Sequence, residues 1–398
     1  MQTEKQPHYD IIIIGAGLVG LTFAGLLANT EMRIAIIDNS PPIQPEPEHE
    51  TRYDLRVCAI TPASEKIFRR LNIWEKMHRI SPFRKMHVWD ELGNGAIDFN
   101  SADIGEPYLG HIIENSVMRA ALLEMLSDHS DIEFFYKTKP TQLYQHENFI
   151  EINCEDSRKF YGTLCVGADG AQSWLRQQGQ FPLESKSYHH TAIVTTIETE
   201  LPHQQTARQR FLKEGVLAFL PLTNPHYCSI VWSTLPAIAE NLCAMNENYF
   251  NIALAKAFDF ALGKTTCLDQ RFSFPLIMQN TKAYVKPRIA LLGDAAHTIH
   301  PLAGQGVNLG IADAVSLAEI VLAANLKDCD LGDLALLKRY QRDRRGSNLL
   351  MLSLMDGFKI LFGSDWQPIV QARNFGLSLT NHLQPMKCWL MQEAMGLK

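Results

Sequence analysis

The glycines near the N-terminus have the spacing of a phosphate-binding turn. Gly15, Gly17 and Gly20 form a G-x-G-x-x-G pattern directly after the apolar run from Ile11 to Ile14. In such a turn the first glycine permits a tight bend, the second lets a pyrophosphate approach the backbone, and the third lets helix and strand pack closely. The pattern alone is weak, because a purely structural glycine turn has the same letters.

The elements around these glycines strengthen the prediction. The sequence predicts a buried strand over residues 9–14, a helix over 18–29, and a second strand over 33–37 that ends at Asp38. The N–H groups at the start of the helix then face the phosphates. A carboxylate about 20 residues beyond the glycines can accept both hydroxyls of an adenosine ribose, and it would repel a 2′-phosphate. We therefore expect a dinucleotide site that favours FAD or NAD over NADP.

A second motif lies in the middle of the chain. Residues 164–171 read as a strand followed by a turn at Asp169 and Gly170, and Ser173 is placed to cap a short helix. Since Asp-Gly is a common turn pair, this segment alone is equally typical of a generic strand and turn.

A third motif favours FAD. Residues 288–292 read as a strand that ends at Gly293 and Asp294, and a glycine-rich loop then precedes a helix that reaches about residue 325. A helix N-terminus behind such a loop stabilises negative charge, and reduced flavin carries that charge on its pyrimidine edge. Asp294, at the tip of a strand, is placed to bind polyol hydroxyls.

The three motifs in this order resemble those of the single-component, FAD-dependent aromatic hydroxylases, the family of p-hydroxybenzoate hydroxylase. The string from His300 to Asp313 is similar to the signature of a narrower group, the ubiquinone-biosynthesis hydroxylases, which hydroxylate the ring of a polyprenyl-phenol. Further segments of that group resemble residues 109–115 with Arg119, 210–211, 217–222, 230–233, 373–377 and 394–396. The resemblance therefore covers nearly the whole chain.

The resemblance implies roles for individual residues. The N-terminal glycines and Asp38 would hold the ADP half of FAD, although many relatives carry the longer Glu at position 38. His300 and Pro301 would approach the flavin as the candidate catalytic residues, but a loop histidine is the simpler interpretation of His300. Tyr188, Tyr227 and Tyr284 are candidates for a base by composition only. The remaining implied cofactor contacts are Arg56, Arg119, Asp169, Gly293, Asp294, Gly304, Gln305, Gly306 and Asn308.

The resemblance also implies the chemistry. NADH or NADPH would reduce the flavin, O2 would form a C4a-hydroperoxide, and the distal oxygen would be transferred to the ring of an apolar, prenylated phenol. Two alternatives stay open. The chain could hydroxylate a small soluble aromatic, or it could be a flavin-binding scaffold subunit of a quinone-biosynthesis complex that does not turn over.

The expected fold is α/β, or α+β overall, with a Rossmann-like FAD-binding domain and an inserted substrate domain. We assign residues 1–85, 110–185 and 280–325 to the discontinuous FAD-binding domain. Residues 86–109 and 186–279 would form the substrate domain, a mainly antiparallel sheet that begins with a hairpin around Gly93 and Gly95. Residues 326–398 would form a C-terminal helical region.

Composition excludes several classes of protein. The formal charge of −6 over 398 residues argues against nucleic-acid binding, which requires neutralised phosphates. The eight cysteines have neither metal-site nor disulfide spacing, so we expect no metal and a cytoplasmic chain.

The stretch 309–326 is nearly apolar, but Asp313 and Glu319 favour a buried helix over a membrane span. Contact with the inner face of the membrane stays open. The apolar stretches 349–355 and 358–362 are expected to face the core rather than a lipid groove.

Overall fold

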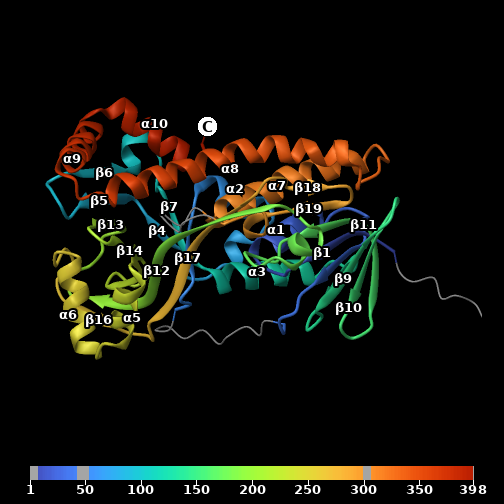
Figure 1. Ribbon diagram of the computed structural model, residues 1–398, viewed down its shortest axis with the longest axis horizontal. Coiled ribbons are helices and arrows are strands. Elements are labelled where there is room, and N and C mark those ends of the chain that lie inside the picture. The colour runs from blue at the N-terminus through green and yellow to red at the C-terminus, as the bar shows by residue number, and fades with distance from the viewer. Residues whose placement is uncertain (1–7, 43–52, 299–305, 398) are drawn as a thin grey trace, which may run out of the picture.

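The computed structural model describes residues 8–42, 53–298 and 306–397. Two large sheets form the two ends of the molecule, and a small sheet lies between them (Figure 1). The C-terminal helices run along one edge and reach from one end to the other (Figure 1).

A mainly parallel sheet forms the nucleotide-binding end. Its central strand β1 (His8–Ile14) pairs in parallel with β2 on one side and with β11 on the other, so Ile11 to Ile14 are buried on both faces. An antiparallel hairpin, β9 and β10, extends β11 outward. The other strands are β18 (Val285–Lys286), β19 (Ile289–Leu291), β11 (Lys159–Gly167), β2 (Ile34–Ile37), β8 (Ile132–Phe135), β9 (Pro140–Gln145) and β10 (Ile150–Cys154).

Helices cover this sheet and share its core. Helix α1 (Leu18–Leu27) packs against α3 (Asn115–Ser127) and against α7 (Gly306–Asn325). Among the described residues, α7 is the one helix long and apolar enough to cross a membrane by length and composition, yet more than half of that stretch is buried. Its packing between α1 and α8 is that of a core helix, as the sequence predicts.

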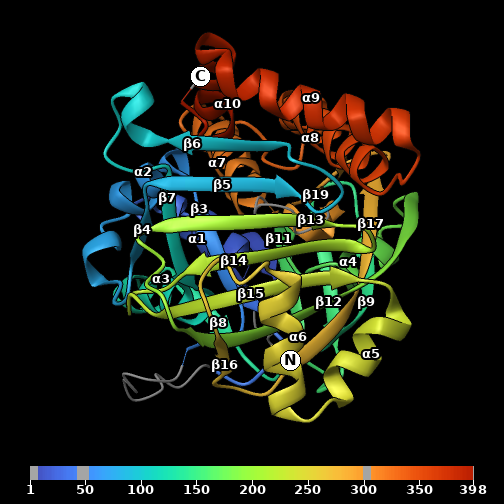
Figure 2. The same cartoon turned by 90° about the vertical axis from the view of Figure 1, so that its left-hand side faces the viewer.

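A second sheet forms the other end of the molecule (Figure 2). Its pairing is antiparallel except between β13 and β5, which run parallel because β5 enters the sheet from the N-terminal part of the chain. Its strands are β20 (His297–Thr298), β17 (Phe272–Thr281), β12 (Leu183–Thr199), β15 (Tyr227–Thr234), β14 (Gly215–Pro221), β13 (Thr206–Leu212), β5 (Lys85–Asp90), β6 (Ala96–Asn100) and the short β16 (Thr265–Cys267). The hairpin predicted around Gly93 and Gly95 is confirmed by the pairing of β5 with β6.

Alternation along β14 and β15 divides the two faces of this sheet. Leu217, Phe219, Ile230 and Trp232 point into a core with α5 (Pro236–Ala244) and α6 (Glu247–Ala257), which cover the outer face (Figure 2). The residues between them in sequence therefore face the parallel sheet.

The remaining elements join the two ends. The small sheet consists of β3 (Val57–Ile60), β7 (Gly110–Glu114) and β4 (Ser81–Phe83). Short helices lie beside it and at the ends of strands: α2 (Pro62–Arg70), α4 (Trp174–Gln178), η1 (Trp74–Lys76), η2 (Ser101–Ile104) and η3 (Gly293–Ala295).

Three helices complete the chain: α8 (Leu334–Phe362), α9 (Gln367–His382) and α10 (Gln384–Ala394). A buried ion pair, Arg373 Nε to Asp90 at 2.6 Å, fastens α9 to the end of β5. The ring of Phe362 stacks on Phe211 of β13 at a centroid distance of 3.6 Å. The expected α/β class with helical C-terminus is confirmed, whereas the exact domain limits stay a prediction.

Candidate flavin site

The glycine turn after β1 has two positions that the fold requires and one that it leaves open. Gly15 has φ +106°, and a Cβ there would meet Ala168 O at 2.5 Å. A Cβ on Gly20 would meet Gly15 O at 2.2 Å. A Cβ on Gly17, the residue that caps α1, would find no described atom nearer than Ala168 O at 4.0 Å. The open space therefore lies in front of the N-terminus of α1, where a pyrophosphate would bind.

Asp38 lies at the end of β2 and accepts hydrogen bonds from two neighbouring loops, the glycine turn after β1 and the loop after β2. Its Oδ2 accepts a hydrogen bond of 2.7 Å from the Ala16 N–H, and its Oδ1 accepts one of 2.7 Å from the Ser40 N–H. The carboxylate thus has a fixed orientation beside the glycine turn. Each oxygen keeps a further lone pair for a ribose hydroxyl.

Arg119 of α3 is near Asp38. Burial raises the pKa of the Tyr136 hydroxyl, Arg119 lowers it and Asp38 raises it, so all three side chains lie close enough to interact. The buried Nε of Arg119 has no hydrogen-bond partner within the described parts of the chain. An unpaired guanidinium donor beside an open helix N-terminus fits an anionic group of a cofactor.

The second motif follows β11. The Oδ2 of Asp169 accepts a hydrogen bond of 3.1 Å from Leu175 N, whereas its buried Oδ1 has no partner among the described residues. Burial raises the pKa of this carboxyl. Arg176 joins this turn to the third motif, because it donates to Ala171 O at 2.6 Å and to Ala295 O at 3.0 Å.

The third motif begins at η3. Gly293 has φ +54°, and its Cα lies close to Gly310 and Val19, so the turn packs tightly on α7 and α1. Asp294 is exposed at the tip of this turn. The surrounding protein removes water from the Asp294 carboxyl, and this desolvation raises its pKa. The positive charges of His297 and Arg56 lower it. Arg56, Asp294 and the glycine turn therefore surround one region.

The structure ties Asn308 into the protein. Its Oδ1 accepts from Thr61 N at 3.1 Å, and its Nδ2 donates to Ala59 O at 2.8 Å, so it links the start of α7 to the turn after β3. Its predicted contact with the flavin ring stays a prediction, as does that of Gly306, the first residue of α7. His300, Pro301, Gly304 and Gln305 lie outside the described residues.

A buried ionic network supports the third motif. Asp313 of α7, with an exposed fraction of 0%, accepts hydrogen bonds from Gly293 N at 3.1 Å and His297 Nε2 at 2.5 Å. Its other oxygen accepts from Arg344 Nε at 2.9 Å and Asn348 Nδ2 at 3.2 Å, both on α8. The roles of these side chains were not predicted from the sequence. The available signal was an acid inside an otherwise apolar helix, which requires buried partners.

Comparison with known proteins shows the family to which the chain belongs. A family model described as an FAD binding domain matches residues 8–351. The chain is 33% identical to ubiquinone hydroxylase UbiL of Rhodospirillum rubrum, over 97% of this chain and 89% of that protein. The chain belongs to the FAD-dependent ubiquinone-biosynthesis hydroxylases. The 3-demethoxyubiquinol 3-hydroxylase of Escherichia coli is 32% identical over 98% of both chains, and human ubiquinone biosynthesis monooxygenase COQ6 is 32% identical over 96% of this chain and 92% of that protein.

Solved structures have the same fold at lower identity. PqsL of Pseudomonas aeruginosa, in complex with 2-aminobenzoylacetate, superposes with a TM-score of 0.79 at 21% identity and covers 93% of this chain and 100% of that chain. The p-nitrophenol 4-monooxygenase PnpA of Pseudomonas putida superposes with a TM-score of 0.77 at 17% identity, over 98% of this chain and 99% of that chain. The protein is thus an FAD-dependent monooxygenase by family. The open space at Gly17 and the unpaired Arg119 donor fit FAD.

The three tyrosines considered as a base differ in their surroundings. Burial raises the pKa of Tyr284 to about 12, and its hydroxyl donates to Asn280 Oδ1 at 3.2 Å. Burial also raises the pKa of Tyr188 far above its ordinary value. Both phenols therefore keep their protons at neutral pH. Tyr227 is half-buried against Tyr53, with ring centroids 6.2 Å apart, and its role stays a prediction.

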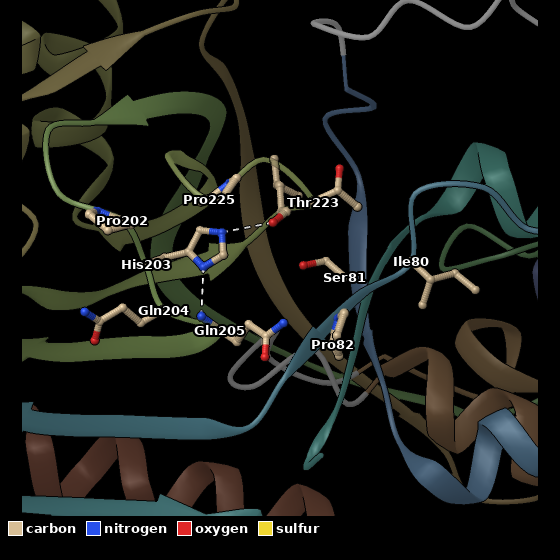
Figure 3. A pocket seen from close by; sticks show the side chains of 10 residues that line it. Ile80, Ser81, Pro82, Pro202, His203, Gln204, Gln205, Thr223 and Pro225 are labelled. Carbon is tan, nitrogen blue, oxygen red and sulfur yellow. Dashed lines mark hydrogen bonds between the residues drawn. The ribbon is translucent and has the colours of Figure 1, made fainter. Parts of the chain in front are cut away.

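Two pockets lie on the second sheet. The first, of about 300 Å³, lies between β4 and the turns at 202–205 and 222–225 (Figure 3). His203 in its wall donates through Nε2 to Leu222 O at 3.0 Å and accepts through Nδ1 from Gln205 N at 3.0 Å, so its imidazole is committed to the fold. The second pocket, of about 490 Å³, lies between β12, β13, β14 and the end of α8. Within the described parts of the chain, no group of three or more His, Cys, Asp or Glu side chains could hold a metal ion.

Proposed function

We propose that this protein hydroxylates the aromatic ring of a prenylated phenol in ubiquinone biosynthesis, with NADH or NADPH as the electron donor. One oxygen atom of O2 enters the ring, the other leaves as water, and the nicotinamide is oxidised. The observation that carries the proposal is the end-to-end match with hydroxylases of this pathway, combined with a site whose open space and unpaired donor fit FAD.

FAD, when bound, supplies the redox and oxygen chemistry, which amino-acid side chains cannot supply. The protein's own residues bind and orient it. The α1 N-terminus and Arg119 bind the phosphates, and Asp38 binds the adenosine ribose. Asp294 binds hydroxyls of the ribityl chain, and the N-terminus of α7 stabilises negative charge at the flavin ring. The hydrogen bond from the Gly293 N–H to the buried Asp313 fixes the orientation of this turn.

The inner face of the second sheet is suited to an aromatic substrate. Val216, Ala218 and Leu220 of β14 and Val231 of β15 are half-buried on the face opposite α5 and α6. A flat apolar wall of this kind orients an aromatic ring and excludes water from the reacting oxygen.

The 490 Å³ pocket gives this face an apolar extension for a prenyl tail. Its apolar lining residues are Phe211, Leu212, Val216, Leu235, Ile360 and Phe362. At its polar end, Lys186 Nζ pairs with Asp356 Oδ2 at 2.7 Å. We also propose that the chain works in the cytoplasm at the inner face of the membrane, where such a substrate resides, and in contact with other enzymes of the pathway.

Two experiments test this function. Deletion of the gene in its host, followed by mass spectrometry of the lipid extract, should reveal one accumulating prenyl-phenol that lacks a hydroxyl group. The purified protein with that compound, the nicotinamide donor and isotopically labelled O2 should yield a product with one labelled oxygen.

The alternatives give different results. Bound FAD that neither NADH nor NADPH reduces, with any phenol present, would identify a scaffold subunit. Turnover of a small phenolic acid without turnover of prenylated phenols would identify a hydroxylase of soluble aromatics.

A further inference from the structure

The second half of α8 exposes a row of large apolar side chains. The exposed fraction reaches 70% for Ile360 and 60% for Leu350. At 100° per residue, these positions fall on one face of the helix, opposite the buried Asn348 and Leu352. The members of this row are Leu349, Leu350, Leu354, Ile360 and Leu361. Residues 349–355 and 358–362 were expected from the sequence to face the core. That expectation is wrong for this row, because no described element covers these side chains.

Helices α9 and α10 add exposed aromatic and aliphatic side chains. They lie beside α8 along the same edge of the molecule (Figures 1 and 2). Their exposed members, including the residue before α9, are Trp366, Phe375, Leu379, Met386 and Trp389. Single exposed leucines are ordinary on a protein surface. A row of five apolar side chains on α8, next to helices that expose two tryptophans, marks an interaction surface. Tryptophan is enriched where protein meets the interface between membrane and water.

The charge of the same region indicates the partner. Lys338, Arg339 and Arg342 are exposed in the first half of α8, and by helical period they continue the face that Leu349 and Leu350 occupy. Three other cations of these helices pair with acids instead: Arg344 with Asp313, Arg373 with Asp90 and Lys387 with Asp103. The exposed cluster of Lys338, Arg339 and Arg342 therefore places positive charge on the same face of α8 as the apolar row.

We propose that the exposed face of α8, α9 and α10, here called the docking face, binds the surface of an anionic lipid bilayer. Apolar side chains would enter the interface while lysine and arginine contact the lipid phosphates. A second copy of the chain fits less well, since a symmetric contact through this face of α8 would bury two copies of the basic cluster. The inference deepens the proposed function. It rests on that function because the bilayer would be the source of the prenylated substrate.

The position of the 490 Å³ pocket supports this orientation. Ile360 belongs both to the docking face and to the lining of the pocket, and Phe362 lines it two residues further on. Docking through this face would therefore set the pocket beside the lipid, so that a prenylated phenol could leave the bilayer without crossing water.

The test is flotation of the purified, FAD-loaded protein with lipid vesicles. Vesicles of phosphatidylcholine alone are compared with vesicles that also contain phosphatidylglycerol, at low and high salt. We expect binding to the anionic vesicles that weakens with salt. The triple variant Leu350→Ser, Phe375→Ser and Trp389→Ser should lower the apparent affinity by at least roughly tenfold, and so should the pair Arg339→Ala and Arg342→Ala.

A matched control comes from the other end of the molecule. Tyr249 and Ile252 of α6 are exposed to 71% and 63%, as much as the docking residues, but lie outside the docking face. Tyr249→Ser with Ile252→Ser should leave vesicle binding unchanged. Flavin absorbance and turnover of a short-chain, water-soluble phenol check that each variant is folded, and they report on the proposed function independently of docking.

Three results would overturn the inference. The wild type could fail to float with anionic vesicles, or the triple variant could float as well as the wild type. Alternatively, the wild type could be a dimer that ignores vesicles and becomes a monomer in the triple variant, which would identify the face as a contact between two copies.

Discussion

Asp313 Oδ2 accepts a hydrogen bond of 2.5 Å from His297 Nε2, and the two side chains are almost completely buried. His297 lies just before the segment of the family signature, and Asp313, on α7, is the last residue of that segment. Arg344 of α8 completes the group. This contact connects the C-terminal helix to the turn that carries Asp294, so the flavin site depends on a segment far along the chain.

Asp313→Asn should destabilise the fold and the flavin site together. Burial alone would raise the pKa of Asp313, but His297 and Arg344 outweigh it and hold the pKa below its ordinary value. The stabilisation is therefore present above about pH 4 and is lost only as the pH falls through the lowered pKa. Removing the charge leaves Arg344 without its partner, and we expect a loss of about 3–5 kcal/mol in the free energy of unfolding. Urea denaturation at neutral pH measures it.

A nearby carboxylate provides the control for this variant. Asp343 is exposed and accepts from Ser316 Oγ at 2.6 Å, a contact that an amide oxygen can also accept. Asp343→Asn should cost about 1 kcal/mol or less. Equal stability of Asp313→Asn and the wild type would show that the network does not support the fold.

Gly17 and Gly20 should respond in opposite ways to an added side chain. Gly17→Val should fold with a nearly unchanged melting temperature but lose FAD, because the side chain fills open space in front of α1. Gly20→Ala should fail to fold well, because its Cβ would meet the backbone oxygen of Gly15 at 2.2 Å. Absorbance near the flavin bands and thermal unfolding separate the two effects. A fully yellow Gly17→Val protein would refute the position of the pyrophosphate.

Asp294→Ala should weaken flavin retention without a large loss of stability. The side chain is exposed at the tip of η3 and makes no side-chain hydrogen bond within the described residues, so its replacement breaks no contact of the fold. Loss of a hydrogen bond to a charged group corresponds to roughly a tenfold or greater rise in the FAD dissociation constant. Asp98→Ala, which removes an exposed carboxylate on β6, is the control. An unchanged flavin affinity would remove Asp294 from the site.

Local patterns were sufficient for the nucleotide-binding turn. The run from Ile11 to Ile14, the spacing of Gly15 and Gly20, and the acid at position 38 act within about 30 residues of chain, so the sequence indicates their geometry. The structure bears out the strand, the helix and the close packing at Gly20.

Local patterns did not predict contacts between segments that are distant in the sequence. Thr61 N donates to Asn308 across 247 positions of chain, and the network of Asp313 draws on three separate elements. Nothing in the local sequence says which partner an asparagine or an acid will meet. Periodicity likewise indicated an apolar face on α8, but whether another element covers that face depends on tertiary packing.

His111→Gln should flatten the acid side of the stability profile. Burial lowers the pKa of His111 to about 4, Glu65 opposes this effect, and Arg69 adds to it. Between about pH 6.5 and about pH 4, the unfolded chain binds a proton that the folded protein does not, so the free energy of unfolding falls as the pH falls. The shift corresponds to a loss of about 3 kcal/mol over that window. Above about pH 6.5 this contribution is constant. Urea denaturation at several pH values across the window should show a shallower slope in the variant, and an identical slope would mean that another group takes up the proton.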